Sequence, residues 1–219
     1  MYFFEKDFWN RDKRRQDEGA KHPCSSRQII RNVTELGLML LLPALCFYCM
    51  EWYEHNPFEE VRSGAQWFNI LLFELIAWSL FFLVKKARLA LRIEIIIAMI
   101  FGLVNHYVML FRSTPFVPWD IFSAGTAASV AADYDFTPSK EVVIVTLLFF
   151  RALILLQFMK LELPGQRLKW FIPAGGCVIA LCILVNNLQD EDFQNRHYLY
   201  PFLFTPVYMT QVNGMAVTF

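Results

Sequence analysis

Five long apolar blocks constrain what this chain can fold into. They lie near residues 33–52, 66–84, 90–111, 141–160 and 168–187. Crossing the hydrocarbon core of a bilayer takes about 20 residues of α-helix, so each block is long enough to span a membrane. The blocks lack the alternation of apolar and polar residues that is typical of membrane β-strands. Since only helices and closed barrels satisfy their backbone in lipid, the sequence predicts an all-α integral membrane protein with five transmembrane helices within residues 32–188.

Basic residues are concentrated on one side of the predicted spans. The segment 1–31 carries eight Lys and Arg residues, and the connections after the second and fourth spans carry most of the others among the 20 in the chain. Lys and Arg favour the cytoplasmic side of a membrane. We therefore expect a multi-pass cell-membrane protein with a cytoplasmic N-terminus and an external C-terminus. Because acidic residues also number 20, the net charge gives no reason to expect a nucleic-acid partner.

The connection between the third and fourth spans, residues 112–140, differs from an ordinary turn. It begins RSTPFVPWDIFSAGTAASVAADYDF and is rich in aromatic and small residues, a composition that argues against disorder. Long connections without regular structure are usually functional or disordered. Pro115 and Pro118 bias the residues before them toward extended conformations, and Asp120 can cap a short helix over 121–132. The sequence thus predicts a structured loop on the external side of the membrane.

Six side chains of this loop are candidates for contact with a lipid headgroup or for holding the loop in shape. They are Arg112, Thr114, Trp119, Asp120, Tyr134 and Asp135. The planar guanidinium of Arg112 matches a phosphate group, and the hydroxyl and carboxyl groups of the loop can hydrogen-bond the hydroxyls of a glycerol headgroup. Tryptophan is also common at the membrane interface. Alternatively, Arg112 pairs with Asp120 or Asp135 inside the loop, and the sequence leaves both possibilities open.

Two oppositely charged residues lie deep in the predicted spans, where an ion without a partner is costly. Arg151 lies about 15 Å along the fourth span from its outer end, at 1.5 Å per residue of helix. Glu74 lies about 12 Å along the second span from the same side. Because the depths agree, we predict that Glu74 and Arg151 form a buried pair in the membrane. The alternative is that Arg151 binds the phosphate of a lipid.

Cysteine and histidine residues give no sign of a metal site or a catalytic site. Cys46 and Cys49 form a C-x-x-C pair in the middle of an apolar block, with no second pair to complete a set of ligands, so packing is their expected role. The four histidines are scattered over both sides of the predicted spans. A zinc site needs three or four ligands held together. We expect no metal and no catalytic residue in this chain.

Several motifs resemble the membrane-embedded half of the lipoteichoic acid synthase family, phosphoglycerol transferases of the alkaline phosphatase and sulfatase superfamily. The motifs are RSTPFVPWDIFS, followed by TAASVAADYDF and TPSKE, and the C-terminal stretch YLYPFLFTPVYMTQVNGMAVTF. The resemblance covers most of the chain from about Asn105 onward. Ser113 departs from it, because glycine is expected there in many relatives, and a serine argues against an unusual backbone angle at this position.

The resemblance implies that the complete enzyme takes glycerol phosphate from phosphatidylglycerol and adds it to a lipid-anchored polymer of the cell wall. Its membrane half would anchor an external catalytic domain and present the lipid to it. That domain would hold a threonine nucleophile and a divalent metal, and residues 189–219 would be an external tail leading toward it. Because the catalytic domain is absent from this chain, we expect no cofactor and no activity of the chain alone. The alternative is a non-catalytic membrane scaffold or partner-binding protein.

Overall fold

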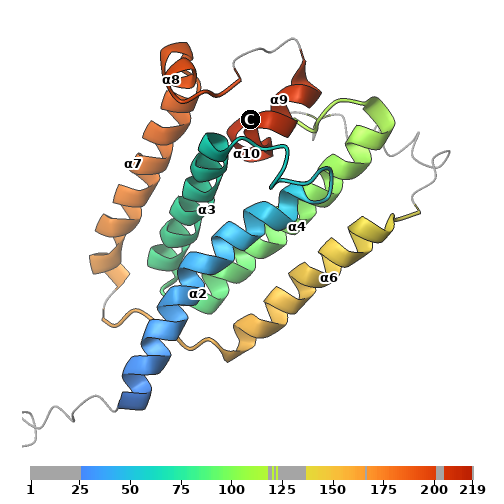
Figure 1. Ribbon diagram of the computed structural model, residues 1–219. Helices are drawn as coiled ribbons and strands as arrows, with labels where there is room; N and C mark the ends of the chain where they lie inside the picture. Colours follow the sequence, from blue (N-terminus) through green and yellow to red (C-terminus); the bar gives the residue numbers. More distant parts are fainter. Residues whose placement is uncertain are drawn as a thin grey trace, which may run out of the picture. The chain divides into compact units, whose positions relative to one another are not determined.

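The computed structural model describes residues 26–117, 120, 122, 137–165, 167–200 and 205–218. Within these residues the chain is all-helical and forms no strand (Figure 1). The elements are α2 (Ser26–Glu51), α3 (Ser63–Val84), α4 (Ala87–Arg112), α6 (Lys140–Leu155), η3 (Leu156–Phe158), η4 (Arg167–Trp170), α7 (Phe171–Leu188), α8 (Glu191–Arg196), α9 (Pro206–Asn213) and α10 (Met215–Thr218). The chain divides into two compact units, residues 1–34, in which α2 begins, and residues 35–219, which hold the other helices.

Four of the described helices are long and apolar enough to cross a membrane. They cover Gln28–Glu51, Ser63–Val84, Lys140–Phe158 and Leu168–Leu188. These helices match the first, second, fourth and fifth predicted spans, and they indicate a membrane protein. The third predicted span is covered by α4, a continuous helix of 26 residues. It is not one of the four, and it carries four charged side chains.

Polar contacts join the helices at the end of the bundle where α2 and α4 finish and α3 and α6 begin, which we call the upper end. The hydroxyl of Tyr53, just after α2, lies 3.0 Å from the hydroxyl of Thr146 on α6. The Oε1 atom of Glu54 lies 2.9 Å from Nδ1 of His106 on α4. The upper ends of α2, α4 and α6 are therefore fixed beside one another.

The opposite, lower end is closed by the connection between η3 and η4. The backbone N–H of Ala87 donates to the carbonyl of Leu161 over 3.1 Å, and the N–H of Leu163 donates to the carbonyl of Lys85 over 2.9 Å. These bonds hold the start of α4 against the connection that leads to α7. Because α4 begins at the lower end and reaches His106 at the upper end, it runs between the same two ends as the four apolar helices.

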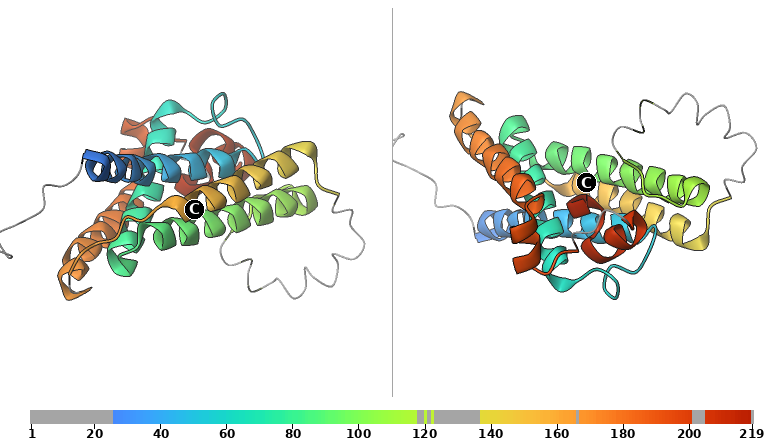
Figure 2. Two further views of the ribbon diagram at one scale, coloured as in Figure 1. Left: turned by 90° about the horizontal axis from the view of Figure 1, so that it is seen from below. Right: turned by 90° about the horizontal axis from the view of Figure 1, so that it is seen from above.

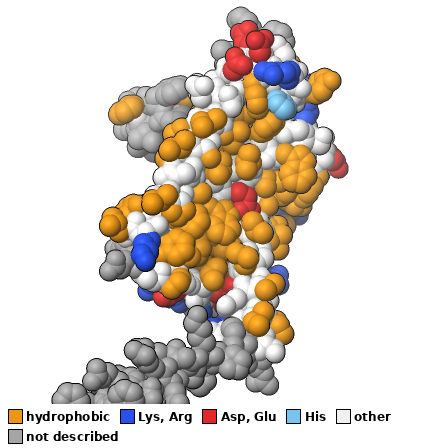
Figure 3. Space-filling view, turned by 90° about the vertical axis from the view of Figure 1, so that its left-hand side faces the viewer, with side chains coloured by type: hydrophobic (Ala, Val, Ile, Leu, Met, Phe, Trp, Pro, Cys, Tyr) orange, Lys and Arg blue, Asp and Glu red, His pale blue; other side chains and the backbone are white. Residues whose placement is uncertain are grey.

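Within this bundle α3 and α4 lie between α7 and α6. α7 packs along α3, and α4 packs against both α3 and α6 (Figures 1 and 2). Of the four apolar helices, the two that contain the outer helices α6 and α7 have the smallest share of buried residues. On the side of α7, apolar side chains cover much of the surface and charged side chains gather mainly toward the top and bottom (Figure 3). Such a surface suits contact with lipid.

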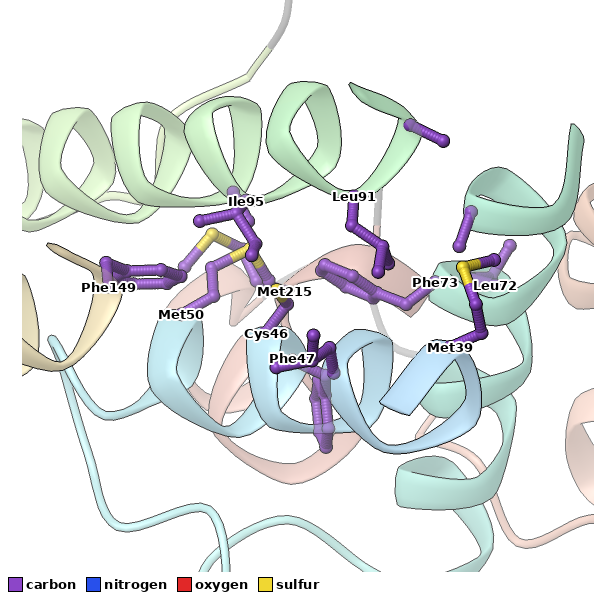
Figure 4. Packing of buried hydrophobic residues seen from close by; sticks show 14 of the residues in the cluster. Met39, Cys46, Phe47, Met50, Leu72, Phe73, Leu91, Ile95, Phe149 and Met215 are labelled. Atoms are coloured by element: carbon purple, nitrogen blue, oxygen red, sulfur yellow. The ribbon is translucent and has the colours of Figure 1, made fainter. Parts of the chain in front are cut away.

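The core of residues 35–219 is built largely from aromatic, methionine and aliphatic side chains. Phe47, Leu91 and Phe149, from α2, α4 and α6, are almost fully buried. Met215 of α10 packs among the residues of these helices (Figure 4), where a flexible methionine side chain can fill an irregular space. Cys46 is also buried in this cluster, so it packs as an apolar residue.

The C-terminal segment folds back onto the upper end of the bundle. It forms the short helices α8, α9 and α10, and five of its described side chains besides Met215 are buried, namely Leu199, Met209, Thr210, Val212 and Asn213. The backbone N–H of Arg62, just before α3, donates to the carbonyl of Val212 over 2.9 Å. Within residues 189–219, which the sequence predicts only as an external tail, α9 and α10 are therefore part of the packed structure.

Asn69 of α3 holds much of this C-terminal segment in place. Its side chain is fully buried, and its Nδ2 donates to the carbonyls of Ala65 over 2.8 Å and Asn213 over 2.7 Å. Its Oδ1 accepts the backbone N–H of Val217 over 3.1 Å. One buried amide therefore satisfies two backbone groups of the C-terminal segment, on either side of Gly214.

Ser113 ends α4 in a left-handed backbone conformation, with φ 53° and ψ 28°. The expectation that a serine disfavours an unusual backbone angle here is therefore wrong. Its N–H donates to the carbonyl of Met109 over 2.9 Å, so the residue closes the last turn of the helix in the manner usual for glycine. The need to turn the chain at the end of α4 outweighs the local preference of serine.

Replacing Ser113 by glycine is expected to stabilise the protein by about 1 kcal/mol, because a residue with a Cβ atom is strained in this conformation. The measurement is unfolding of the purified chain in detergent, monitored by circular dichroism. Ser113→Ala keeps the Cβ atom and serves as the control, with little change expected. Equal stability of the glycine and alanine variants would contradict the account of the backbone strain.

Candidate functional site

An ion pair shapes the loop that follows α4. Nη1 of Arg112 lies 2.7 Å from Oδ1 of Asp120. The other oxygen of Asp120 accepts the N–H of Val117 over 3.0 Å, and the N–H of Asp120 donates to the carbonyl of Val117 over 2.8 Å. Of the two internal partners that the sequence leaves open for Arg112, Asp120 is thus the one found, while Asp135 lies outside the described residues.

The beginning of the loop is held against α4 by Asn105. Its Oδ1 accepts the backbone N–H of Phe116 over 2.8 Å. The ring of Phe116 is mostly buried and lies edge-on to Phe101, with ring centroids 5.4 Å apart. The position of Asn105 near the end of an apolar helix is the only signal that sequence reasoning could use to find this contact.

Of the remaining loop candidates, the structure describes Thr114 but not Trp119, Tyr134 or Asp135. The Oγ1 atom of Thr114 is buried, with no hydrogen-bond partner in the part of the chain that the structure describes. Trp119 and Tyr134, like Asp135, lie outside the described residues. The side chain of Arg112 is 51% exposed, so its guanidinium is accessible although it is paired.

Asp120 is an ionised partner in this loop. The hydrogen bond from Arg112, aided by the N–H of Val117, holds the pKa of the Asp120 carboxyl below its ordinary value. A carboxyl group with a depressed pKa in the folded state stabilises that state above its ordinary pKa, and the contribution is lost as the pH falls below about 4. The contact between Arg112 and Asp120 is therefore fully present at neutral pH.

A cluster of mostly polar side chains surrounds a cavity at the upper end. The cavity has a volume of about 30 Å³. Its lining comes from the end of α2, from α4 and from the C-terminal segment, and consists of Glu51, Glu54, His55, Asn105, Met109, Thr210, Gln211 and Met215. Sequence reasoning missed this site, although the spacing of Glu51 and His55, four residues apart, places both on one side of a helical turn.

Glu51 and His55 are two polar residues of this cavity whose side chains are 0% and 5% exposed. Oε1 of Glu51 accepts the backbone N–H of Met215 over 2.6 Å, and Oε2 lies 3.6 Å from Nε2 of His55. Within the described residues, Oε2 of Glu51 and both ring nitrogens of His55 have no hydrogen-bond partner. Burial holds the pKa of His55 below its ordinary value, against a smaller opposing effect of Glu60, so the ring is neutral at pH 7.

The structure does not form the predicted intramembrane pair of Glu74 and Arg151. Oε2 of Glu74 accepts the indole N–H of Trp78 over 3.1 Å, while Arg151 is exposed on α6. No ion pair joins the two residues in the described ranges. The reason is that α4 packs against both α3 and α6 and separates the helices that carry them. Equal depth in the membrane does not make two helices neighbours.

The effects of Glu74→Gln and Arg151→Gln on stability are expected to be additive within about 0.5 kcal/mol, because residues without contact or shared partners do not couple. A double-mutant cycle, measured by unfolding in detergent, gives the interaction free energy directly. A coupling well above that value would restore the direct pair.

A different acidic side chain is buried close to Glu74. Glu94 of α4 is 3% exposed, neither of its carboxyl oxygens has a hydrogen-bond partner among the described residues, and it interacts electrostatically with Glu74. Across the described part of the chain, no three His, Cys, Asp or Glu side chains gather closely enough to hold a metal ion.

No protein-family model, curated protein or solved structure matches this chain. The resemblance to lipoteichoic acid synthases therefore depends on the residues of its motifs alone.

Proposed function

We propose that this chain is the membrane domain of a lipoteichoic-acid-synthase-like transferase, which moves glycerol phosphate from phosphatidylglycerol to a lipid-anchored polymer. The domain anchors an external catalytic domain and presents the donor lipid to it. The nucleophile and the divalent metal belong to that external domain. The motifs of the loop and of the C-terminal stretch support this proposal, together with the accessible cation at the end of α4.

The proposed topology has five crossings of the cell membrane, with α4 as the third crossing and the upper end on the external side. The course of α4 between the same two ends as the four apolar helices supports this count. Lys85, Lys86, Arg88 and Arg92 all lie near the lower end, and basic residues favour the cytoplasmic side. The N-terminus is then cytoplasmic.

The observation that carries the proposal is the guanidinium of Arg112, half exposed at the upper end of α4. Its contact with Asp120 involves Nη1. A guanidinium has five N–H donors in a planar fork, so a single carboxylate leaves donors for a second anion. In the proposed orientation, that anion is the phosphate of a phospholipid in the outer leaflet, which arginine can bind through two parallel hydrogen bonds.

Asp120 has a positioning role in this proposal. It fixes the guanidinium through one oxygen and the loop backbone through the other, so that Arg112 is held in place before the lipid binds. Preorganisation of this kind lowers the entropic cost of binding.

The test is native mass spectrometry of the purified chain with phosphatidylglycerol. We expect preferential retention of phosphatidylglycerol over phosphatidylethanolamine and loss of most bound phosphatidylglycerol in Arg112→Ala. Lys140→Ala serves as the matched control, because Lys140 is an exposed cation at the same end of the bundle and should leave retention unchanged. Equal retention in the wild type and in Arg112→Ala would refute the proposal.

A further inference from the structure

The cavity at the upper end holds buried polar atoms that no described residue of the chain satisfies. The Glu51 side chain is 0% exposed and that of His55 is 5% exposed. Oε2 of Glu51 and both ring nitrogens of His55 have no hydrogen-bond partner among the residues that the structure describes. Buried polar atoms in folded proteins are nearly always hydrogen-bonded. These atoms line a space that has room for a small group, so a bound ligand can supply the missing partners.

The cavity lies on the same face of α4 as Arg112. Asn105 and Met109 both line it, and Arg112 follows Met109 by three residues on the same helix. Residues three and four apart in a helix are neighbours on one face, about 5–6 Å apart at their Cβ atoms. A lipid whose phosphate is bound by Arg112 can therefore extend the rest of its headgroup along this face toward Met109 and the cavity.

The size of the cavity limits what it can hold. About 30 Å³ accommodates two or three water-sized groups, since one water needs about 10–15 Å³ measured in this way. The end of a glycerol headgroup is a vicinal diol with two hydroxyl groups. A sugar headgroup is much larger than this space.

The chemistry of the lining also selects among small headgroups. Each hydroxyl group can both donate and accept a hydrogen bond. One hydroxyl can donate to Oε2 of Glu51 and another can accept from the ring N–H of a neutral His55. An ammonium group has donors only, so ethanolamine would leave the N–H of His55 without an acceptor.

We propose that this cavity binds the terminal diol of the phosphatidylglycerol headgroup, with Glu51 and His55 as its hydrogen-bonding partners. The inference rests on the proposed function, because Arg112 must bind the phosphate of the same lipid. It places recognition of the glycerol hydroxyls beneath the loop, at side chains of α2 and the turn after it, and not at Thr114 or Asp120. Glu51 also accepts the backbone N–H of Met215 in the C-terminal segment, so the same side chain would contact both the lipid and this segment.

The experiment compares the retention of phosphatidylglycerol, phosphatidic acid and phosphatidylethanolamine by native mass spectrometry. Phosphatidic acid offers the phosphate but no diol. Glu51→Gln keeps an oxygen for the N–H of Met215 but replaces the second acceptor by a donor. His55→Phe keeps the ring and removes both nitrogens, so it is a second variant that breaks no hydrogen bond found in the folded chain. Thermal unfolding of both variants confirms that they remain folded.

We expect phosphatidylglycerol retention to fall about tenfold in either variant, the effect of one lost hydrogen bond, while phosphatidic acid retention stays at the wild-type value. An unchanged ratio of the two lipids in both variants overturns the inference and shows a cavity that holds waters only. Preference of the wild type for phosphatidylethanolamine, lost in Glu51→Gln, also overturns it, because the site would then bind an ammonium group. Arg112→Ala should lower retention of both anionic lipids, and failure of that result alone counts against the proposed function.

Discussion

Gly214→Ala is expected to destabilise the protein by about 3 kcal/mol and to release the C-terminal segment from the upper end. Gly214 has φ 81° and ψ 153°, a conformation that is almost restricted to glycine and costs other residues about 1–3 kcal/mol. A Cβ atom there would also lie 2.6 Å from Nδ2 and 3.0 Å from Cγ of Asn69. The clash adds an overpacking cost of about 1–3 kcal/mol, because the buried amide of Asn69 is held by three hydrogen bonds.

Two glycines provide matched controls for this substitution. Gly165 also has a positive φ, 84°, but nothing lies within 4 Å of a Cβ atom built on it, and the same space is open at Gly176 within α7. Gly165→Ala should therefore show the backbone strain alone, and Gly176→Ala should show neither cost. Unfolding in detergent gives the stabilities, and limited proteolysis reports release of the segment. If Gly214→Ala costs no more than Gly165→Ala, Asn69 does not hold the segment as described.

Asn69→Ala is expected to cost about 3 kcal/mol of stability. The substitution leaves the carbonyl of Asn213 and the N–H of Val217 without their partner, and each buried polar group left unsatisfied costs about 1–3 kcal/mol. It also leaves a void at a fully buried position, which adds a packing loss.

Asn186→Ala is the control for this prediction, because Asn186 is exposed near the end of α7 and exposed substitutions usually change stability by no more than about 0.5 kcal/mol. Protease cleavage within residues 205–218 should become faster in Asn69→Ala and not in Asn186→Ala. Equal unfolding temperatures for the two variants would show that the C-terminal segment docks without the help of Asn69.

The helices could largely be predicted from hydropathy, because a helix that crosses lipid must be apolar along its whole length. The second block, predicted at 66–84, is Ser63–Val84, and the fourth, predicted at 141–160, is Lys140–Leu155 with η3 after it. α2 starts earlier than the apolar block near 33. A change in hydropathy marks where lipid contact begins and does not mark where helical hydrogen bonding begins.

The contacts between helices could not be predicted in the same way. Depth along a span gives one coordinate of a charged residue, and the order of helices around the bundle gives the others, which is why Glu74 and Arg151 are separated by α4. The α9 and α10 helices are short and contain buried polar residues such as Thr210 and Asn213. Their sequences carry no hydropathy signal. What holds them in place is hydrogen bonds to Asn69 and Glu51, which lie far away in the sequence.

The loop after α4 contains one contact that the sequence could suggest and two features that it could not. The spacing of Arg112 and the two aspartates was enough to suggest an internal ion pair, since oppositely charged side chains in a short loop are within reach of each other. The role of Asn105 depends on how the loop folds back onto α4, and the left-handed angle of Ser113 depends on the same turn. Neither follows from local preference.

The proposed recognition of lipid by Arg112 and by the cavity requires the upper end to face the outside of the cell. The direct measurement is labelling of single cysteines with a membrane-impermeant thiol reagent in intact and permeabilised cells, in a chain whose five native cysteines are all replaced by alanine. Phe122 and Tyr198 are 92% and 79% exposed near the upper end, and the Lys86 side chain is 55% exposed at the lower end. Phe122→Cys and Tyr198→Cys should be labelled in intact cells, and Lys86→Cys only after permeabilisation. Labelling of Phe122→Cys only after permeabilisation would contradict the external position of the upper end and the lipid recognition that depends on it.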